Sequence, residues 1–230
     1  MKGKLIGAGL VLALGMAQPA SAAMIDFSDG LWGGFADSNG SATRTFNGLD
    51  VTLQAFNTNG QTTFTETAFD GGAALCDNVG LNCSSDGVGI NDDEVTYGVG
   101  GKSDVERLKV SFSRSVDIAS IFFLDFFAAG GQSNDSNDEV IQYQINVNGQ
   151  GSSFTGTATD TTGLFVGSNP GLLKGVNSIE FFADTAPSIA SPSNTDFALA
   201  GIKTVPEPGT LALLGLGLAG LGLSRRRKAA

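Results

Sequence analysis

The chain has 230 residues, with 13 Lys and Arg, 23 Asp and Glu and no histidine, and its formal net charge is −10 at pH 7. Without histidine, Ser–His and Cys–His nucleophiles are excluded, and neither a G-x-S-x-G nor an S-x-x-K motif supplies an activated serine. The acidic balance also argues against nucleic acid as a partner, because neutralising phosphates requires Lys and Arg. We therefore predict that the protein is not an enzyme and has no catalytic residues.

Residues 1–22 have the three parts of a secretory signal peptide. Two lysines lie near the start, an apolar run follows over Leu5–Met16, and the small residues Ala20–Ala22 form a cleavage site after a proline. Cleavage is expected after Ala22 or after Ala23. A retained N-terminal anchor is the alternative, and the cleavage site disfavours it. We predict that signal peptidase removes this segment and that the protein is exported across the inner membrane.

Residues 23–204 are predicted to form one folded domain. Residues 24–204 retain 7 of the 13 basic and 22 of the 23 acidic residues, so their net charge is −15. This charge suits cations or a hydrated polysaccharide as partners. A solvated acidic surface that keeps an exported protein soluble explains the same charge, so both interpretations stay open.

Alternating apolar residues predict half-buried β-strands in several parts of this domain. Residues 49–55 and 108–112 show the alternation, and residues 141–147 show it most clearly. Asn148–Gly149 then predicts a tight turn, with residues 154–158 returning as the second strand of a hairpin.

Residues 118–127 differ, because they are apolar on both faces except at Asp125, which predicts a central strand covered on both sides. Residues 178–183 and 197–203 complete a set of about eight to ten short strands, separated by polar turns. No long helical pattern interrupts them. The predicted fold is all-β, a single antiparallel β-sandwich of the jelly-roll type.

Cys76 and Cys83 are the two cysteines of the chain, in a loop rich in Gly, Asn and Asp. In an exported protein, such a pair predicts a structural disulfide. A zinc site is disfavoured, because there is no histidine to complete the ligand set.

Two acidic loops are candidates for a calcium site. Calcium takes six to eight oxygen ligands from carboxylates, amides and carbonyls, and both loops are rich in such groups. Neither has the spacing of a known calcium loop, and Asp and Asn that form turns would give the same composition. The candidate ligands are Asp86, Asn91, Asp92, Asp93, Glu94, Asp135, Asp138 and Glu139.

The last 26 residues, 205–230, consist of three parts. Val205, Pro206, Glu207 and Pro208 form an extended motif, because each proline fixes its own φ and restricts the residue before it. An apolar run follows over Leu211–Leu223. It is shorter than the ~20 residues that span a bilayer comfortably. Its position before a basic cluster nevertheless favours a short, temporary transmembrane helix over a core helix. The cluster, which would stay in the cytoplasm, comprises Arg225, Arg226, Arg227 and Lys228.

The sequence V-P-E-P-G-T-L-A-L-L-G-L-G-L-A-G-L-G-L-S-R-R-R-K resembles the PEP-CTERM sorting signal of Gram-negative bacteria that produce exopolysaccharide. The resemblance includes all three parts in order. It implies that an exosortase, a membrane-embedded cysteine transpeptidase, cleaves near Pro-Glu-Pro and releases the protein to the cell surface or matrix. Residues 87–95, 106–112, 121–125 and 196–202 resemble, more loosely, exported domains that carry this signal.

Three functions are compatible with these observations. The first is a non-enzymatic protein of the cell envelope, cell surface or extracellular matrix, as in a biofilm. The second is a carbohydrate-binding module, calcium-dependent or not, that acts on exopolysaccharide. The third is a glycan-active enzyme with a pair of carboxylates. The scarcity of aromatic platforms, limited to Trp32, Tyr97 and Tyr143 besides Phe, disfavours the last two. Trp32 fits either an exposed platform or a buried anchor.

Overall fold

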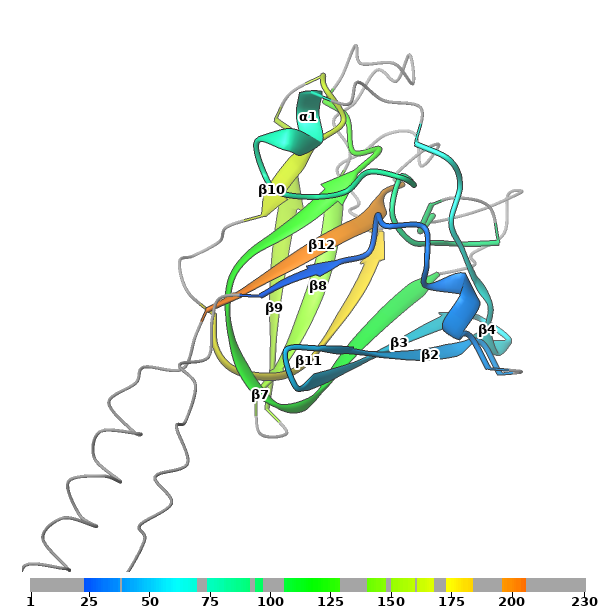
Figure 1. The fold of residues 1–230 in the computed structure, drawn as a ribbon, viewed down its shortest axis with the longest axis vertical. Helices are drawn as coiled ribbons and strands as arrows, with labels where there is room; N and C mark the ends of the chain where they lie inside the picture. Colours follow the sequence, from blue (N-terminus) through cyan, green and yellow to red (C-terminus); the bar gives the residue numbers. More distant parts are fainter. Residues whose placement is uncertain are drawn as a thin grey trace, which may run out of the picture. The chain divides into compact units, whose positions relative to one another are not determined.

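A computed structural model of the chain describes residues 23–37, 39–69, 74–91, 94–96, 106–128, 140–147, 150–159, 161–167, 173–183 and 196–205. Strand β7 (Arg107–Leu124) is the longest of the strands in these ranges, and Figure 1 shows it as a strongly curved ribbon in green. It joins residues 108–112 with most of residues 118–127, two segments that the sequence predicts as separate strands. The strand ends at Leu124, so the prediction was wrong for residues 125–127. Between the two segments, the three residues Ser113–Ser115 are exposed, where the alternation of buried and exposed side chains is interrupted.

Strand β7 has different partners along its two halves, all of them antiparallel. On one side it pairs with β11 (Leu173–Ala183) and then with β10 (Phe165–Gly167). On the other side its first half pairs with β3 (Leu49–Asn57), and its second half pairs with β12 (Ala198–Val205). Because two strands share one side of β7 in succession, the sheet divides there into two branches.

The remaining strands extend these branches. Strands β2 (Ser41–Phe46) and β4 (Gly60–Thr62) pair with β3, and β1 (Met24–Asp26) pairs with β12. On the far side of β11 lie β8 (Val140–Val147) and β9 (Gln150–Thr157), which form the predicted hairpin. A separate small sheet consists of β5 (Phe64–Thr65) and β6 (Gly89–Ile90). The helical elements of the described residues are η1 (Gly33–Phe35) and α1 (Ala74–Asp77).

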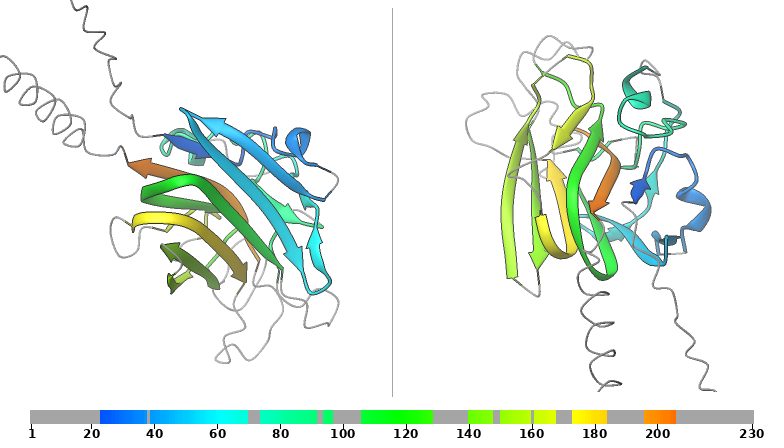
Figure 2. Two further views of the ribbon diagram at one scale, coloured as in Figure 1. Left: turned by 90° about the horizontal axis from the view of Figure 1, so that it is seen from below. Right: turned by 60° about the vertical axis from the view of Figure 1, so that its left-hand side comes forward.

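The predicted all-β, antiparallel fold is therefore confirmed. Figure 2 shows the curled sheet from two further sides, in which β3, with β2 as its other neighbour, is paired with the first half of β7. The sandwich-like arrangement comes from one sheet that curls and divides at β7, with the described strands belonging to the compact unit Ser21–Glu207.

The second half of β7 is buried on both faces, as its sequence predicted. Ile121 and Phe123 face the main core, whereas Phe122 and Leu124 face a smaller cluster that contains Cys76. Phe123 is fully buried, and its ring meets Phe181 and Phe197 edge-on at centroid distances of 5.6 and 5.5 Å. Edge-on aromatic pairs add to the stabilisation from burial alone.

Replacing Phe123 by alanine removes the ring on which the two aromatic contacts depend. We expect F123A to lower the free energy of unfolding by ~3–5 kcal/mol, the usual cost of removing a buried phenylalanine. Chemical denaturation followed by circular dichroism measures this loss. As a control, L31A changes a side chain that is 55% exposed and should stay within about 0.5 kcal/mol of the wild type. Equal losses for the two variants would contradict the assignment of Phe123 to the core.

Candidate functional site

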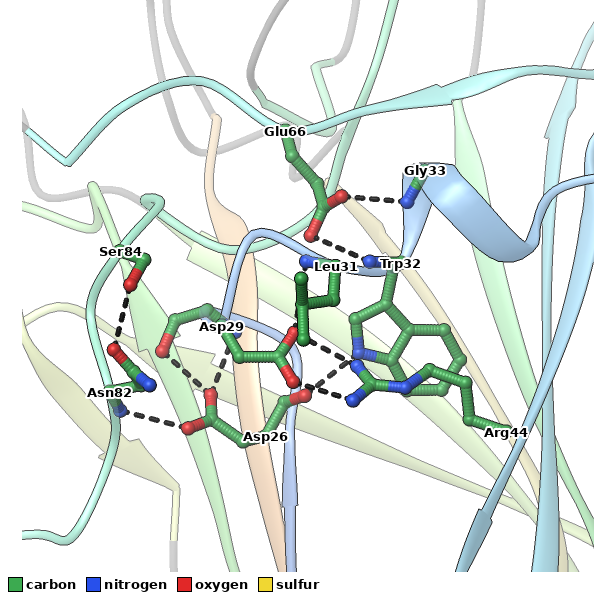
Figure 3. Close-up of polar contacts among 10 residues, drawn as sticks. Asp26, Asp29, Leu31, Trp32, Gly33, Arg44, Glu66, Asn82 and Ser84 are labelled. Carbon is green, nitrogen blue, oxygen red and sulfur yellow. Dashed lines mark hydrogen bonds and ion pairs between the residues drawn. The ribbon is translucent and has the colours of Figure 1, made fainter.

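Trp32, the single tryptophan of the chain, lies at the centre of a polar and aromatic cluster between β1 and β2 (Figure 3). Its side chain is fully buried, and its Nε1 donates a hydrogen bond to the backbone oxygen of Asp26 at 2.8 Å. The ring packs against Phe27 and Phe46, at centroid distances of 4.7 and 5.9 Å. Of the two roles compatible with the sequence, Trp32 therefore has that of the buried anchor.

Arg44 of β2 covers the Trp32 ring and holds the loop that leads to it. Its Cζ lies 5.0 Å from the centre of the Trp32 ring, and 5.3 and 5.2 Å from the centres of Phe35 and Phe46. Its Nη1 and Nη2 contact the two carboxylate oxygens of Asp29, at 2.8 and 2.7 Å. A planar guanidinium can stack on rings and bind a carboxylate through two nitrogens at once, which a lysine cannot do.

Glu66 holds the backbone of the same loop at Trp32 and Gly33. Its Oε1 accepts a hydrogen bond from the backbone N–H of Trp32 at 3.3 Å, and its Oε2 accepts one from Gly33 at 2.7 Å. Burial raises the pKa of Glu66, and the nearby charge of Asp29 raises it further. The hydrogen bonds from the two backbone N–H groups and the charge of Arg44 lower the pKa of Glu66, but by less than burial raises it.

The disulfide between Cys76 and Cys83 is present, as predicted. The loop that it closes is hydrogen-bonded to the end of β1 and to the residues that follow it. Four consecutive backbone N–H groups, those of residues 82–85, donate hydrogen bonds to Asp26 and Ser28 at 2.8–3.0 Å. Asp26 accepts, in addition, the N–H and the hydroxyl of Ser28. The disulfide loop and β1 are thus held together by polar contacts across more than 50 residues of sequence.

These contacts give the carboxylates of the cluster a structural role. Asp26 and Glu66 accept from backbone N–H groups, and Asp29 is paired with Arg44. Of the large apolar side chains that the structure describes, two are exposed, and both belong to this loop. These are Leu31 and Phe35, which are 55% and 53% exposed. The cluster therefore presents an apolar pair at the surface on a firmly held backbone.

The proposed calcium ligands are only partly described. Asp86 is buried, and the amide Nδ2 of Asn91 donates to Glu106 at 2.7 Å. Glu94 accepts the backbone N–H of Ile90 through its own backbone oxygen. The described residues contain no group of three or more His, Cys, Asp or Glu side chains that could hold a metal ion. The other candidates, Asp92, Asp93, Asp135, Asp138 and Glu139, lie outside the described residues, so calcium binding stays a prediction.

The predicted sorting motif begins at the end of the sheet. Val205 is the last residue of β12, and it pairs with Asp117 of β7. Pro206 and the residues that follow, with the apolar run and the basic cluster, lie outside the described part, as does the predicted signal peptide. Within the described part, no helix has the length and apolar character needed to cross a membrane.

Comparison with known families supports the sequence prediction for this end of the chain. The family model described as the PEP-CTERM protein-sorting motif matches residues 204–228. The chain is therefore an exported, envelope-associated protein of the class that carries this motif and is sorted by an exosortase. A search of curated proteins found no match.

Sequence reasoning missed the cluster around Trp32. Its partners Arg44 and Glu66 are separated from Trp32 by 12 and 34 positions, and neither belongs to a recognisable motif. The one signal was Trp32 itself, a large aromatic side chain with glycines on both sides.

The raised pKa of Glu66 predicts a specific pH dependence. Because the folded state binds this proton more tightly than the unfolded state, the contribution of Glu66 to the free energy of unfolding is greatest below about pH 4.3, the unfolded-state value. It falls as the pH rises through the raised folded-state pKa. The E66Q variant lacks this contribution, so the stability of the wild type relative to E66Q should fall from acidic to neutral pH. Urea denaturation followed by the fluorescence of Trp32 measures it, and a pH-independent difference would contradict the prediction.

Proposed function

We propose that the protein acts as a non-enzymatic component of the cell surface or extracellular matrix of a Gram-negative bacterium. The observation that carries this proposal is the sorting motif over residues 204–228, which begins within the last two residues of the folded sheet. A further support is chemical, because the chain has no histidine. In the cluster at Trp32, the carboxylates of Asp26 and Glu66 accept hydrogen bonds from backbone N–H groups, which is a structural and not a catalytic use.

The tail is proposed to serve only for delivery. The apolar run 211–223 inserts in the membrane for a time, the basic residues stay in the cytoplasm, and the exosortase removes the tail near Pro206–Pro208. The domain that remains is acidic and contains the described strands.

Changing the two prolines of the motif should block removal of the tail. We expect P206A/P208A to stay in the membrane fraction at the mass of the signal-processed chain with its tail, because the prolines that define the extended motif are gone. The wild type should be released at a mass reduced by the tail. Fractionation and intact-mass spectrometry of a host that contains an exosortase measure both. L31A, which changes an exposed residue outside residues 204–228, is the control and should behave as wild type. A released wild-type protein that keeps its tail would contradict the proposal.

A second candidate function is binding of exopolysaccharide, and one observation favours it. Phe35 and Leu31 are both exposed on the loop that contacts Arg44 and Glu66, and exposed apolar surface can mark a binding site. Phe35 would supply the apolar face for a sugar ring.

This second function predicts that F35A loses at least about tenfold in affinity for the exopolysaccharide of its host, the loss expected when a central aromatic contact of ~1.4 kcal/mol is removed. Co-sedimentation with the polysaccharide, with and without EDTA, measures the affinity and its dependence on calcium. F56A is a matched control, because Phe56 also lies beneath an arginine, Arg107, at 5.5 Å. Equal binding by F35A and F56A would exclude the Phe35 surface as the sugar site.

A further inference from the structure

The two ends of the described domain are joined by hydrogen bonds between Ala23 and Thr204, two of which use the Thr204 side chain. The backbone N–H of Ala23 donates to Oγ1 of Thr204 at 3.2 Å, and this hydroxyl donates to the backbone oxygen of Ala23 at 3.1 Å. The backbone N–H of Thr204 donates to the same oxygen at 2.9 Å. Both residues are buried, with exposed fractions of 8% and 6%. We refer to these three hydrogen bonds as the terminal clasp.

The terminal clasp lies on the side of β12 that faces away from β7, at the end of the strand. Beyond it, β1 pairs with residues 201–203, Phe27 donates to Ala200, and Val88 exchanges two hydrogen bonds with Leu199. The opposite side of β12 is paired with β7 from Ala198 to Val205. The strand therefore lies inside the sheet as far as Thr204, whereas Val205 is half-buried and pairs with Asp117 of β7.

The clasp involves both ends that processing would create. Ala23 is the first residue after the predicted signal peptide, and Thr204 is the first residue matched by the sorting motif. An enzyme that takes an extended peptide commonly does so through the N–H and C=O groups of the peptide backbone. In β12 these groups are already engaged on both sides as far as Thr204, so an enzyme acting there would have to unpair the strand first.

We propose that Thr204 is a positioning residue for the processing of this chain. Its contacts confine the sorting cleavage to the C-terminal side of Val205, and they require the mature protein to begin at Ala23. The part that concerns sorting rests on the proposed function. In that step one amide C–N bond breaks. The carbonyl carbon gains the oxygen of water or the nitrogen of an acceptor amine, and the tail leaves as an amine with the proton that the nucleophile gives up.

The starting residue follows from the same contacts. Cleavage after Ala22 leaves Ala23 in place with its nitrogen still able to donate to Thr204. Cleavage after Ala23 removes that donor together with the oxygen that accepts two hydrogen bonds from Thr204. Of the two cleavage positions that the sequence left open, only the first keeps the clasp.

The first test measures the clasp itself on the full chain, without any sorting enzyme. T204V removes the hydroxyl with little change in volume, and T204S restores it. T43V is the matched control, because Thr43 is an exposed strand residue whose hydroxyl bonds to that of Thr52 at 2.8 Å. We expect the amide of residue 204 to exchange with solvent about tenfold faster in T204V than in wild type, since local opening becomes easier. T204S and T43V should keep the wild-type rate.

A wild-type exchange rate at residue 204 in T204V would overturn the clasp. An unchanged exchange rate at the amide of Val110 shows that the sheet of the variant stays folded.

The second test identifies the ends of the released protein by mass spectrometry in a host that contains the exosortase. The wild type should begin at Ala23 and end at Val205 or beyond. In T204V, species that end before Val205 should increase several-fold, and T204S should suppress them. A wild-type product that begins at Met24 or ends at or before Thr204 would overturn the proposal, as would identical products from T204V and wild type. If the wild-type tail is retained on the released protein, the proposed function fails instead, and the exchange measurement still decides whether the clasp exists.

Discussion

The fold depends on the hydrogen bonding of β7 to strands on both of its sides, which continues with register shifts in its pairing with β11 and β12. Four strands, β3, β10, β11 and β12, use β7 as their partner, so a change in its register would displace all of them. Its first half alternates between the core and the opposite face, and its second half is apolar on both faces because both are covered. One side of that second half completes the main core, and the other packs on the cluster beside the disulfide. The location of the disulfide loop is thus a consequence of how β7 is buried.

The cluster at Trp32 shows how an acidic domain keeps charged groups in a partly buried place. Asp29 is neutralised by Arg44, and Asp26 receives several hydrogen-bond donors. Glu66 also receives two donors, yet burial keeps its pKa raised, so its contribution to the free energy of unfolding depends on pH. Hydrogen bonds to charged groups each contribute about 1.5–3 kcal/mol, which explains how a loop rich in glycine holds Leu31 and Phe35 at the surface.

The strands could be predicted from the sequence because alternation and burial are local signals. Residues 49–55 belong to β3, residues 108–112 and the first seven residues of the predicted strand 118–127 belong to β7, and β8 and β9 form the expected hairpin. The continuity of β7 across Ser113–Ser115 was not predicted, because three polar residues in a row look like a turn when their partners are unknown. The disulfide was predictable from two cysteines in an exported chain. The contacts of Trp32 with Arg44 and Glu66, and of Ala23 with Thr204, were not. They join residues as far as 181 positions apart that only the folded sheet brings together.

We propose that residues 23–205 fold without the two terminal segments, which serve delivery and add no stability. Urea unfolding of residues 23–205, compared with that of the same chain extended to residue 230, tests it most directly. We expect one cooperative transition with the same free energy of unfolding for both chains, within about 0.5 kcal/mol, the usual effect of changes outside a core. A shorter chain that is unfolded, or clearly less stable than the longer one, would contradict it.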